Sequence, residues 1–272
     1  MMNLILLQLV TMLRNLYRSI GIIAIVIAVL CYQADDLRAR EGVILTSVSK
    51  EYANGLDVRI LKVIARNLGM KLEIRHASFA RRLIFLEEGK IDICAGVYKT
   101  PEREKYIYFT QSQYKTSSSK YFFVLKGKKS TIQKYEDLYD LDVGTGINSL
   151  YFERFDNDQQ LSKVRTGTTE QRFKMLLLNR IDAVIQGFLG GQAVINKLGI
   201  GDKIEIAEYY HQETRPAHVG ISRKSPLMEN LDEIEFVIRK MTKNGEFKRI
   251  CDEYIAQILA SSRHTELPPD QF

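Results

Sequence analysis

Two stretches of sequence that repeat one pattern decide the fold. Residues 82–95 read RLIFLEEGKIDICA, and residues 172–185, at an offset of 90, read RFKMLLLNRIDAVI. Each combines an amphipathic helix, a residue that tolerates positive φ (Gly89 or Asn179), a basic residue, Ile-Asp and an apolar strand. Helix–turn–strand units often resemble one another, so that simpler explanation stays open. We favour the interpretation that the chain builds two α/β lobes of similar design.

The rest of the chain alternates strands and helices. Residues 57–68 read DVRILKVIARNL, with apolar residues at helical spacing, and Gly69 follows as a helix terminator. Ser78 is placed to cap the next helix. We expect strands at 43–48, 72–76, 91–95, 119–126, 141–145 and 218–222, helices at 57–68, 79–88, 228–242 and 246–259, and a further helix opening near Thr168. This alternation predicts a mostly parallel α/β sheet.

Two lobes of this kind would share a ligand site. In open α/β sheets, ligands bind beyond the carboxyl ends of the strands. Facing lobes would therefore place residues 95–98 and 185–187 on opposite walls of one cleft.

The first 34 residues differ from the rest in composition. They contain no acid, two bases (Arg14 and Arg18) and an apolar run, IGIIAIVIAVL. A basic region before a short apolar core is typical of a secretory signal, whereas a membrane span needs about 20 apolar residues. A cleaved signal, an uncleaved membrane anchor and a lipoprotein attached at Cys31 stay open, and the start could be Met1 or Met12. Each alternative exports the rest of the chain, which predicts a periplasmic protein.

Composition and charge exclude several classes of protein. The 272 residues are 45% hydrophobic and 26% charged, unlike a disordered, collagen-like or multi-span membrane chain. The net charge is +6; Arg14 and Arg18 account for two of these charges, so +4 remains on residues 35–272. The basic residues are dispersed, without a run of five. We therefore expect no nucleic-acid partner.

The sequence offers no motif of catalysis or metal binding. Its four histidines lack close metal spacing, and neither a phosphate-binding loop nor a nucleophile elbow occurs. We expect no metal, no cofactor and no catalytic residue. Cys94 and Cys251 are expected as free core thiols rather than a disulfide framework. Asp57, Asp92 and Asp182 recur at element boundaries, where we expect caps and turn residues.

Seven segments occur in an order found in one known family. They read GLDVRILKVIARNLGMKLEI, FARRLIFLEEGKIDICAG, TPEREKYIYFTQSQY, YEDLYDLDVGT, TTEQRFKMLLLNRIDAVI, HVGISRKSP and MTKNGEFKRICDEY. In these segments residues 42–256 resemble the family 3 extracellular solute-binding proteins, the polar amino-acid type of bacterial ABC importers.

The resemblance implies a fold and a partner. The fold would be α/β, the bilobed type II fold of periplasmic binding proteins, with hinge crossings near residues 125–128 and 215–219. A monomer would bind a small carboxylate or amino-acid-like ligand and meet an ABC permease in the inner membrane. The expected domains are a signal peptide or anchor at 1–34, a first lobe at 35–126 and 218–260, a second lobe at 127–217 and a loose tail at 261–272.

Arg103 is the first residue to which the resemblance assigns a ligand contact. The sequence TPER has the form of a helix start, with Thr100 as the cap and Pro101 at the first helical position. Helix N-termini attract anions, and a guanidinium can bind a carboxylate with two hydrogen bonds. In the family, the arginine of this motif holds the ligand's α-carboxylate. The alternative is a surface arginine paired with Glu102 or Glu104.

Five further positions match ligand contacts of the family. Phe79 and Tyr52 fall where the family has aromatics that pack on the ligand, although ordinary core packing would explain either. Tyr98 replaces a serine or threonine that bonds the ligand, and would narrow the cleft. Asn148 and Ser149 fall at the start of the second lobe's first helix. Ser149 could offer its hydroxyl and amide to a carboxylate, or either residue could simply cap that helix.

The main departure from the family lies at Gln186 and Gly187. Amino-acid binders of this family place an aspartate near Gly187, and it pairs with the ligand's ammonium group. Here Gln186, Gly187 and Phe188 include no acid, and Glu51 is the nearest candidate. We expect Gln186 to contact the ligand, and standard amino acids to bind weakly or not at all.

Three functions fit these expectations. The leading hypothesis is a periplasmic binding protein without chemistry of its own, which closes over its ligand and delivers it to an importer. The second is an orphan or sensory binding module without a dedicated permease. The third is an enzyme similar to the cyclohexadienyl dehydratases of this fold, which act on prephenate or arogenate. That activity needs a positioned acid or base, for which Glu51 is the loose candidate.

Overall fold

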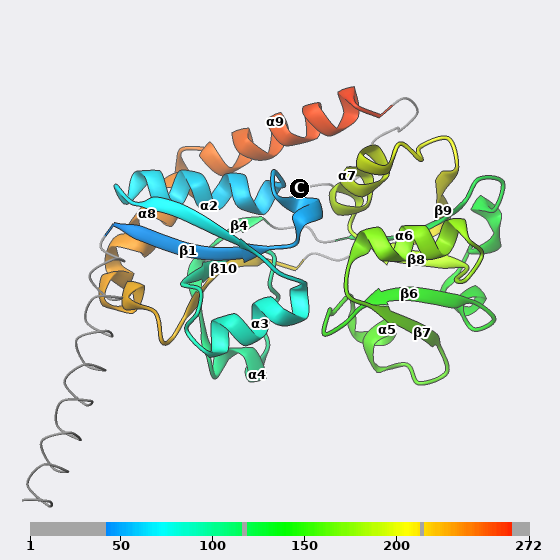
Figure 1. Cartoon of the computed structure of the whole chain (residues 1–272), viewed down its shortest axis with the longest axis horizontal. Helices are drawn as coiled ribbons and strands as arrows, with labels where there is room; N and C mark the ends of the chain where they lie inside the picture. Colours follow the sequence, from blue (N-terminus) through cyan, green and yellow to red (C-terminus); the bar gives the residue numbers. More distant parts are fainter. Residues whose placement is uncertain (1–41, 116–118, 213–214, 263–272) are drawn as a thin grey trace, which may run out of the picture. The chain divides into compact units, whose positions relative to one another are not determined.

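The strands of the chain are divided between two lobes. The computed structural model describes residues 42–115, 119–212 and 215–262. The strand pair β1-β2 and the sheet β3-β10-β4 form what we call the first lobe, and the sheet β7-β6-β8-β5-β9 forms the second lobe (Figure 1). The predicted signal or anchor at 1–34, and all but the start of the predicted tail, lie outside the described residues.

The first lobe contains the two ends of the described chain. Its elements are β1 (Val43–Val48), η1 (Lys50–Tyr52), α2 (Leu56–Asn67), β2 (Lys71–His76), α3 (Phe79–Glu87), β3 (Ile93–Cys94), α4 (Pro101–Glu104), β4 (Ile107–Lys115), β10 (Ala217–Ser222), η4 (Pro226–Asn230), α8 (Leu231–Lys243) and α9 (Glu246–Ala260). The first of the two C-terminal helices was expected from residue 228. It begins at Leu231, because Ser225 and Pro226 start a separate 3-10 turn.

The second lobe is built from the middle of the chain. Its elements are β5 (Lys120–Leu125), η2 (Lys129–Thr131), η3 (Tyr135–Leu138), β6 (Asp142–Gly146), α5 (Glu153–Asn157), β7 (Ser162–Thr166), α6 (Thr169–Leu177), β8 (Ala183–Gln186), α7 (Phe188–Leu198) and β9 (Ile204–His211). Within the described ranges of both lobes, no helix is long and apolar enough to span a membrane.

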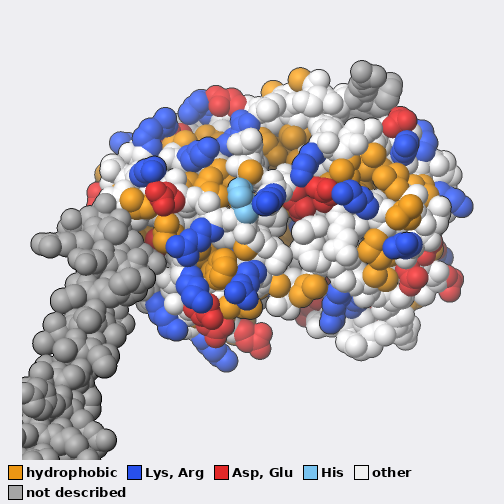
Figure 2. Space-filling view, viewed as in Figure 1, with side chains coloured by type: hydrophobic (Ala, Val, Ile, Leu, Met, Phe, Trp, Pro, Cys, Tyr) orange, Lys and Arg blue, Asp and Glu red, His pale blue; other side chains and the backbone are white. Residues whose placement is uncertain are grey.

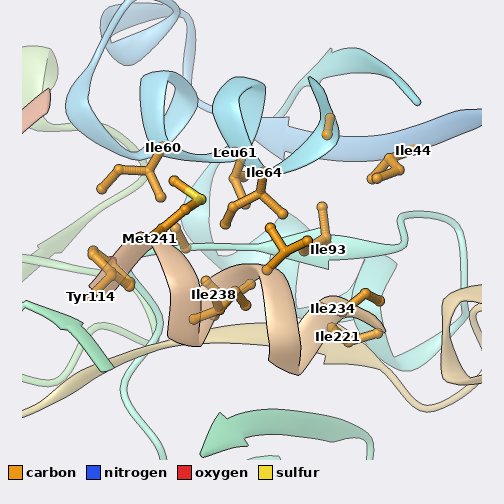
Figure 3. Close-up of a cluster of buried hydrophobic side chains, with 14 of the residues drawn as sticks. Ile44, Ile60, Leu61, Ile64, Ile93, Tyr114, Ile221, Ile234, Ile238 and Met241 are labelled. Carbon is orange, nitrogen blue, oxygen red and sulfur yellow. The ribbon is translucent and has the colours of Figure 1, made fainter. Parts of the chain in front are cut away.

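The core of the first lobe lies between α2 and α8. Ile60 and Ile64 on α2, and Ile234 and Ile238 on α8, recur every four residues, so each helix has one apolar face. Figure 3 shows these side chains, with Met241, pointing towards one another. All five are fully buried, and burial of each stabilises the lobe by roughly 1.5–3 kcal/mol.

The last helix, α9, packs against both lobes. Phe247 and Ile250 in its first half join the core of the first lobe, whereas Tyr254 and Ile258 join the core of the second lobe. Asn196 of α7 donates a hydrogen bond of 3.1 Å to the Ile258 carbonyl. The helix was expected to belong to the first lobe alone, and its second half instead ties the two lobes together.

The repeated pattern builds the same helix in both lobes. The side chains of Ser78 and Thr168 cap α3 and α6 by accepting a hydrogen bond from the backbone three residues on. Beyond the two helices, Gly89 and Asn179 have φ values of 71° and 52°. Both residues therefore supply the left-handed conformation that their sequence predicted.

The aspartates of the pattern also have matching structural roles. The Asp92 carboxylate accepts a hydrogen bond of 2.7 Å from the Leu45 amide at β1. The Asp182 carboxylate accepts one of 2.8 Å from the Asp142 amide at β6. Each aspartate thus has a structural role, as expected, although it ties the strand after its helix to another strand of its lobe, β1 or β6, instead of acting as a cap or turn residue.

The strand β5 differs from expectation. It was placed at the end of the first lobe, with the crossing near residues 125–128, but it pairs antiparallel with β8 and β9 of the second lobe. The chain therefore crosses before β5. Residues 121–124 (YFFV) are buried on both faces of this strand, which suits the interior of a five-stranded sheet. The other domain limits stay predictions.

The sheets are mixed rather than mostly parallel. In the second lobe β6 pairs in parallel with β7 and β8, whereas β5 runs antiparallel to its neighbours. In the first lobe β10 runs antiparallel to β3 and β4. β5 and β10 are the strands that follow the two crossings. Each enters its sheet from the other lobe and pairs antiparallel with its neighbours.

Both cysteines of the described chain are free and buried, as expected. Burial raises the pKa of Cys94 to about 12 and that of Cys251 to about 11. The reactive thiolate form is therefore disfavoured at both positions, and neither thiol has the electropositive, exposed setting of a nucleophile.

We expect Asp92→Ala to lower the free energy of unfolding by about 1–3 kcal/mol, because it leaves the buried Leu45 amide without its partner. We expect Asp182→Ala to lower it by about 0.5–1.5 kcal/mol, because water can reach the exposed Asp142 amide. Urea denaturation would measure the change, with the exposed Asp202→Ala as the matched control. A loss no larger than that of the control would contradict the structural role.

Candidate ligand-binding cleft

A cavity of about 330 Å³ lies between the two lobes. This volume is within the range of pockets that hold small molecules. Six of the seven predicted ligand-binding residues line the cavity: Tyr52, Phe79, Tyr98, Arg103, Ser149 and Gln186. The side chain of Asn148 does not line it, although its carbonyl is bonded by Arg103.

Arg103 is held at the boundary of the lobes. Thr100 caps α4 by accepting a hydrogen bond of 3.2 Å from the Arg103 amide, as the sequence predicted. The buried guanidinium donates through Nη1 to the Tyr98 carbonyl (2.9 Å) and through Nη2 to the Asn148 carbonyl of the second lobe (3.0 Å). Burial lowers the pKa of Arg103 below its usual value.

The surface ion pair considered for Arg103 does not form. Within the described residues no carboxylate lies at ion-pair distance from its guanidinium, and Glu104 pairs with Lys99 instead. The three hydrogen-bond acceptors that fix the Arg103 residue are neutral oxygens. The positive charge is therefore left for an anion to balance.

Phe79 lies beside two guanidinium groups. Its ring centroid is 5.5 Å from the guanidinium carbon of Arg82 and 5.6 Å from that of Arg103. Such contacts stabilise cations through the face of the ring. Phe79 lines the cavity as expected, and a direct contact with a ligand stays a prediction.

Tyr98 contacts the second lobe at the cavity. Its hydroxyl accepts a hydrogen bond from Lys120 Nζ of β5, and the guanidinium of Arg215 lies 4.7 Å from the ring centroid. Lys120 also lines the cavity, so this contact holds a cation at the cavity wall, and the narrowing of the cleft by Tyr98 stays a prediction.

Asn148 and Ser149 form a turn after β6. Asn148 has a φ of 59°, and the Ser149 amide donates to the Gly146 carbonyl (3.0 Å). The first helix of the second lobe, α5, begins at Glu153 with Phe152 as its N-cap, so neither Asn148 nor Ser149 caps it. The expected helix start was therefore wrong. Tyr151 and Phe152 are buried, and Phe152 has an extended backbone, so the helix begins only after them.

Tyr52 and Gln186 contact each other across the cleft. Gln186 Nε2 donates to the Tyr52 hydroxyl (3.0 Å), and that hydroxyl donates to the Gly190 carbonyl of α7 (3.3 Å). Burial raises the pKa of Tyr52 well above its usual value, which keeps the hydroxyl protonated. The two residues therefore close one end of the cavity by binding each other.

Glu51 binds the first turn of α6 in the opposite lobe. Its two carboxylate oxygens accept hydrogen bonds from the amides of Thr169 (2.8 Å) and Glu170 (3.2 Å). Helix N-termini favour negative charge, so this contact stabilises the closed arrangement of the lobes. Glu51 is consequently engaged and is not a free partner for an ammonium group.

Asp57 is an acid of the cavity wall that the sequence did not point to. Its carboxylate accepts a long hydrogen bond of 3.4 Å from Tyr114 and lies against Gly96, where a Cβ would collide with it. Gly96 has a φ of 71°, so glycine is needed there for two reasons. Burial raises the pKa of Asp57, while Arg82 and Lys115 oppose that rise.

Four cations of the cavity were also missed: Arg82, Lys115, Lys120 and Arg172. One signal was present in the sequence, because Arg82 and Arg172 open the two copies of the repeated pattern. Among the described residues, no group of three or more His, Cys, Asp or Glu could hold a metal ion.

A family model supplies the identity that the geometry suggests. The model of the bacterial extracellular solute-binding proteins, family 3, matches residues 46–257. The chain belongs to this family. Its solute-binding role follows from that membership, and its relatives include amino-acid-binding proteins.

Relatives in the family bind different amino acids. The L-cystine-binding protein TcyJ of Escherichia coli (strain K12) is 22% identical over 201 residues, which cover 74% of this chain and 73% of that protein. The ABC transporter arginine-binding protein 1 of the same strain is 23% identical over 214 residues, which cover 75% of this chain and 82% of that protein.

Solved structures of the family confirm the fold class. An ancestral arginine-binding protein bound to arginine has a TM-score of 0.66, 23% identity and coverage of 78% of this chain and 98% of its own. The substrate-binding protein AbpA of Streptococcus pneumoniae, bound to L-arginine, has a TM-score of 0.68, 23% identity and coverage of 83% and 98%. The predicted bilobed type II fold is therefore present, and the likeness carries the fold rather than the ligand.

We expect Glu51→Ala to speed hydrogen exchange at the amides of Thr169 and Glu170 by about 5- to 30-fold, because it removes a helix cap worth roughly 1–2 kcal/mol. Hydrogen-exchange mass spectrometry of the peptide that contains these amides would measure it. The exposed Glu73→Ala is the control, and equal exchange in the two variants would contradict the contact.

Proposed function

We propose that this protein is a periplasmic solute-binding protein that closes over a small carboxylate or amino-acid-like ligand. One observation carries the proposal: the Arg103 guanidinium is buried at the cavity, bonded only to neutral oxygens of the chain. A guanidinium in this setting retains donors and full charge for a carboxylate.

Contacts across the cavity support a mechanism of lobe closure. Arg103, Tyr52 and Glu51 each bond to the second lobe, and each of these bonds is polar. Water can replace such bonds when the lobes separate, because a hydrogen bond contributes a net ~0.5–1.5 kcal/mol. A ligand that bridges the lobes would add bonds to both and shift the balance towards the closed form.

Delivery to an ABC permease is the part of the proposal that rests on the family. Its relatives include proteins named for ABC transporters and for amino-acid binding. An orphan or sensory module would bind ligand in the same way and lack a permease. Genes for a permease and an ATPase beside this one would support transport, and uptake unchanged by deletion of this gene would support the orphan alternative.

The structure adds one residue that would suit a second candidate function, the dehydration of a cyclic carboxylate. Asp57 lies at the cavity, and burial raises its pKa, which suits a general acid. Assay of phenylpyruvate formation from prephenate would test this function. Turnover lost in Asp57→Asn would support an enzyme, and the absence of turnover in the unaltered protein would leave the binding function.

We expect Arg103→Ala to weaken binding of carboxylate ligands by about 10- to 100-fold, since hydrogen bonds to a charged group are worth roughly 1.5–3 kcal/mol. A thermal-shift screen of carboxylates and amino acids would supply the ligands for calorimetric titration. Arg103→Lys should be intermediate, because it keeps the charge and loses the two-pronged geometry. The exposed Arg66→Ala is the control, and unchanged affinity in Arg103→Ala would remove Arg103 from the site.

A further inference from the structure

The repeated pattern begins with an arginine in each lobe, and both arginines line the cavity. Arg82 is the fourth residue of α3, and Arg172 is the fourth residue of α6. The two side chains are only 6% and 4% exposed. The lobes therefore present equivalent cations to one space, as their shared design requires.

Neither guanidinium has its hydrogen-bonding capacity filled. Arg82 Nη1 donates to the Ala95 carbonyl at a long 3.5 Å, and its Nε has no partner. Arg172 donates to the hydroxyls of Thr169 (2.7 Å) and Thr166 (3.5 Å), and its Nε also has no partner. Buried charges of proteins are normally paired, so two buried arginines whose hydrogen-bond acceptors are all neutral favour an anionic ligand at the cavity.

The charges of the cavity wall are unbalanced. Its described lining residues include five cations and two acids; the cations are Arg82, Arg103, Lys115, Lys120 and Arg172. Of the acids, Glu51 is bound by the amides of α6, and Asp57 lies within Coulombic reach of Arg82 and Lys115. Five cations minus two acids leave three positive charges, and one carboxylate on the ligand would still leave two of them.

The excess is a local property of the cavity. On the outer face in Figure 2, Lys and Arg side chains are interspersed with Asp and Glu. Water screens charges on that face, whereas a space enclosed between two lobes screens them much less. The cavity therefore selects the charge of its ligand more strongly than the net charge of the protein would suggest.

We propose that the ligand carries two anionic groups, one bound by Arg103 and the second bound where Arg82 and Arg172 face the cavity. A dicarboxylate or an acidic amino acid has this chemistry. The inference rests on the proposed binding function and narrows its ligand class. A cationic ligand such as the arginine of the structural neighbours would add positive charge to an already cationic wall.

Calorimetric titration with matched pairs of compounds tests the ligand class. The compounds with two carboxylates are succinate, glutarate, L-aspartate and L-glutamate, and the matched compounds with one less negative charge are butyrate, valerate, L-asparagine and L-glutamine. L-arginine completes the panel. We expect at least one compound with two carboxylates to bind about 10-fold or more tightly than its matched compound, because the second carboxylate gains hydrogen bonds to charged donors.

Variants of the two arginines test the second subsite. Arg82→Gln and Arg172→Gln should each weaken binding of the best two-carboxylate compound by about 10-fold or more and leave binding of its matched compound nearly unchanged. Arg81→Gln and Arg180→Gln are controls, because both side chains are exposed; Arg81 lies on α3 and Arg180 follows α6. Thermal unfolding of each variant establishes that it is folded, and Arg82→Lys and Arg172→Lys should restore part of the affinity. If only one of the two glutamine variants weakens binding, the second anionic group of the ligand lies at the arginine of that lobe.

The outcomes separate this inference from the proposed function. Binding of a matched compound or L-arginine as tight as that of the best two-carboxylate compound, and unchanged in Arg82→Gln and Arg172→Gln, overturns the second anionic group but preserves a binding protein that depends on Arg103. Failure of every two-carboxylate compound to bind overturns this inference, and failure of every compound in the wider screen of carboxylates and amino acids overturns the proposed function.

Discussion

Burial of guanidinium groups between the lobes is the constraint on which the cleft depends. A charge moved out of water needs hydrogen bonds and a counter-charge. Arg103 donates hydrogen bonds to carbonyl oxygens of both lobes, but no carboxylate of the described residues lies at ion-pair distance from it. The cleft is consequently built as a receptor for anions. Phe79 lies beside both Arg82 and Arg103, and its ring face stabilises their positive charges without supplying a negative charge.

The lobes are joined by two kinds of interaction at different places. α9 joins them through apolar side chains in two cores, which water cannot replace without a large loss of free energy. Glu51, Tyr52 and Arg103 join them through one or two hydrogen bonds each at the cavity. Separation at the cavity therefore costs less than separation at α9. This difference favours an opening of the cleft in which the packing of α9 is kept.

The sequence predicted the local structure of the site well and its wider surroundings poorly. Caps and left-handed residues act within a few positions of the chain, so Thr100, Gly89 and Asn179 were placed correctly. The lobe to which β5 belongs depends on pairings with β8 and β9, more than 50 residues away. Propensity and periodicity carry no information about such partners, and the strand was assigned to the wrong sheet.

By itself, the sequence determined the family, the two-lobe design and the start of α4 at Thr100 and Pro101, because each depends on short-range hydrogen bonds or on the order of motifs. Only the tertiary structure decided which charges meet. In the folded chain Glu51 is hydrogen-bonded to α6, and Asp57 lies at the cavity wall. Arg82 and Arg172, from opposite lobes, line the same cavity. Electrostatic interactions act between residues that are distant in sequence, so the charge of a cleft exists only once the lobes have folded around it.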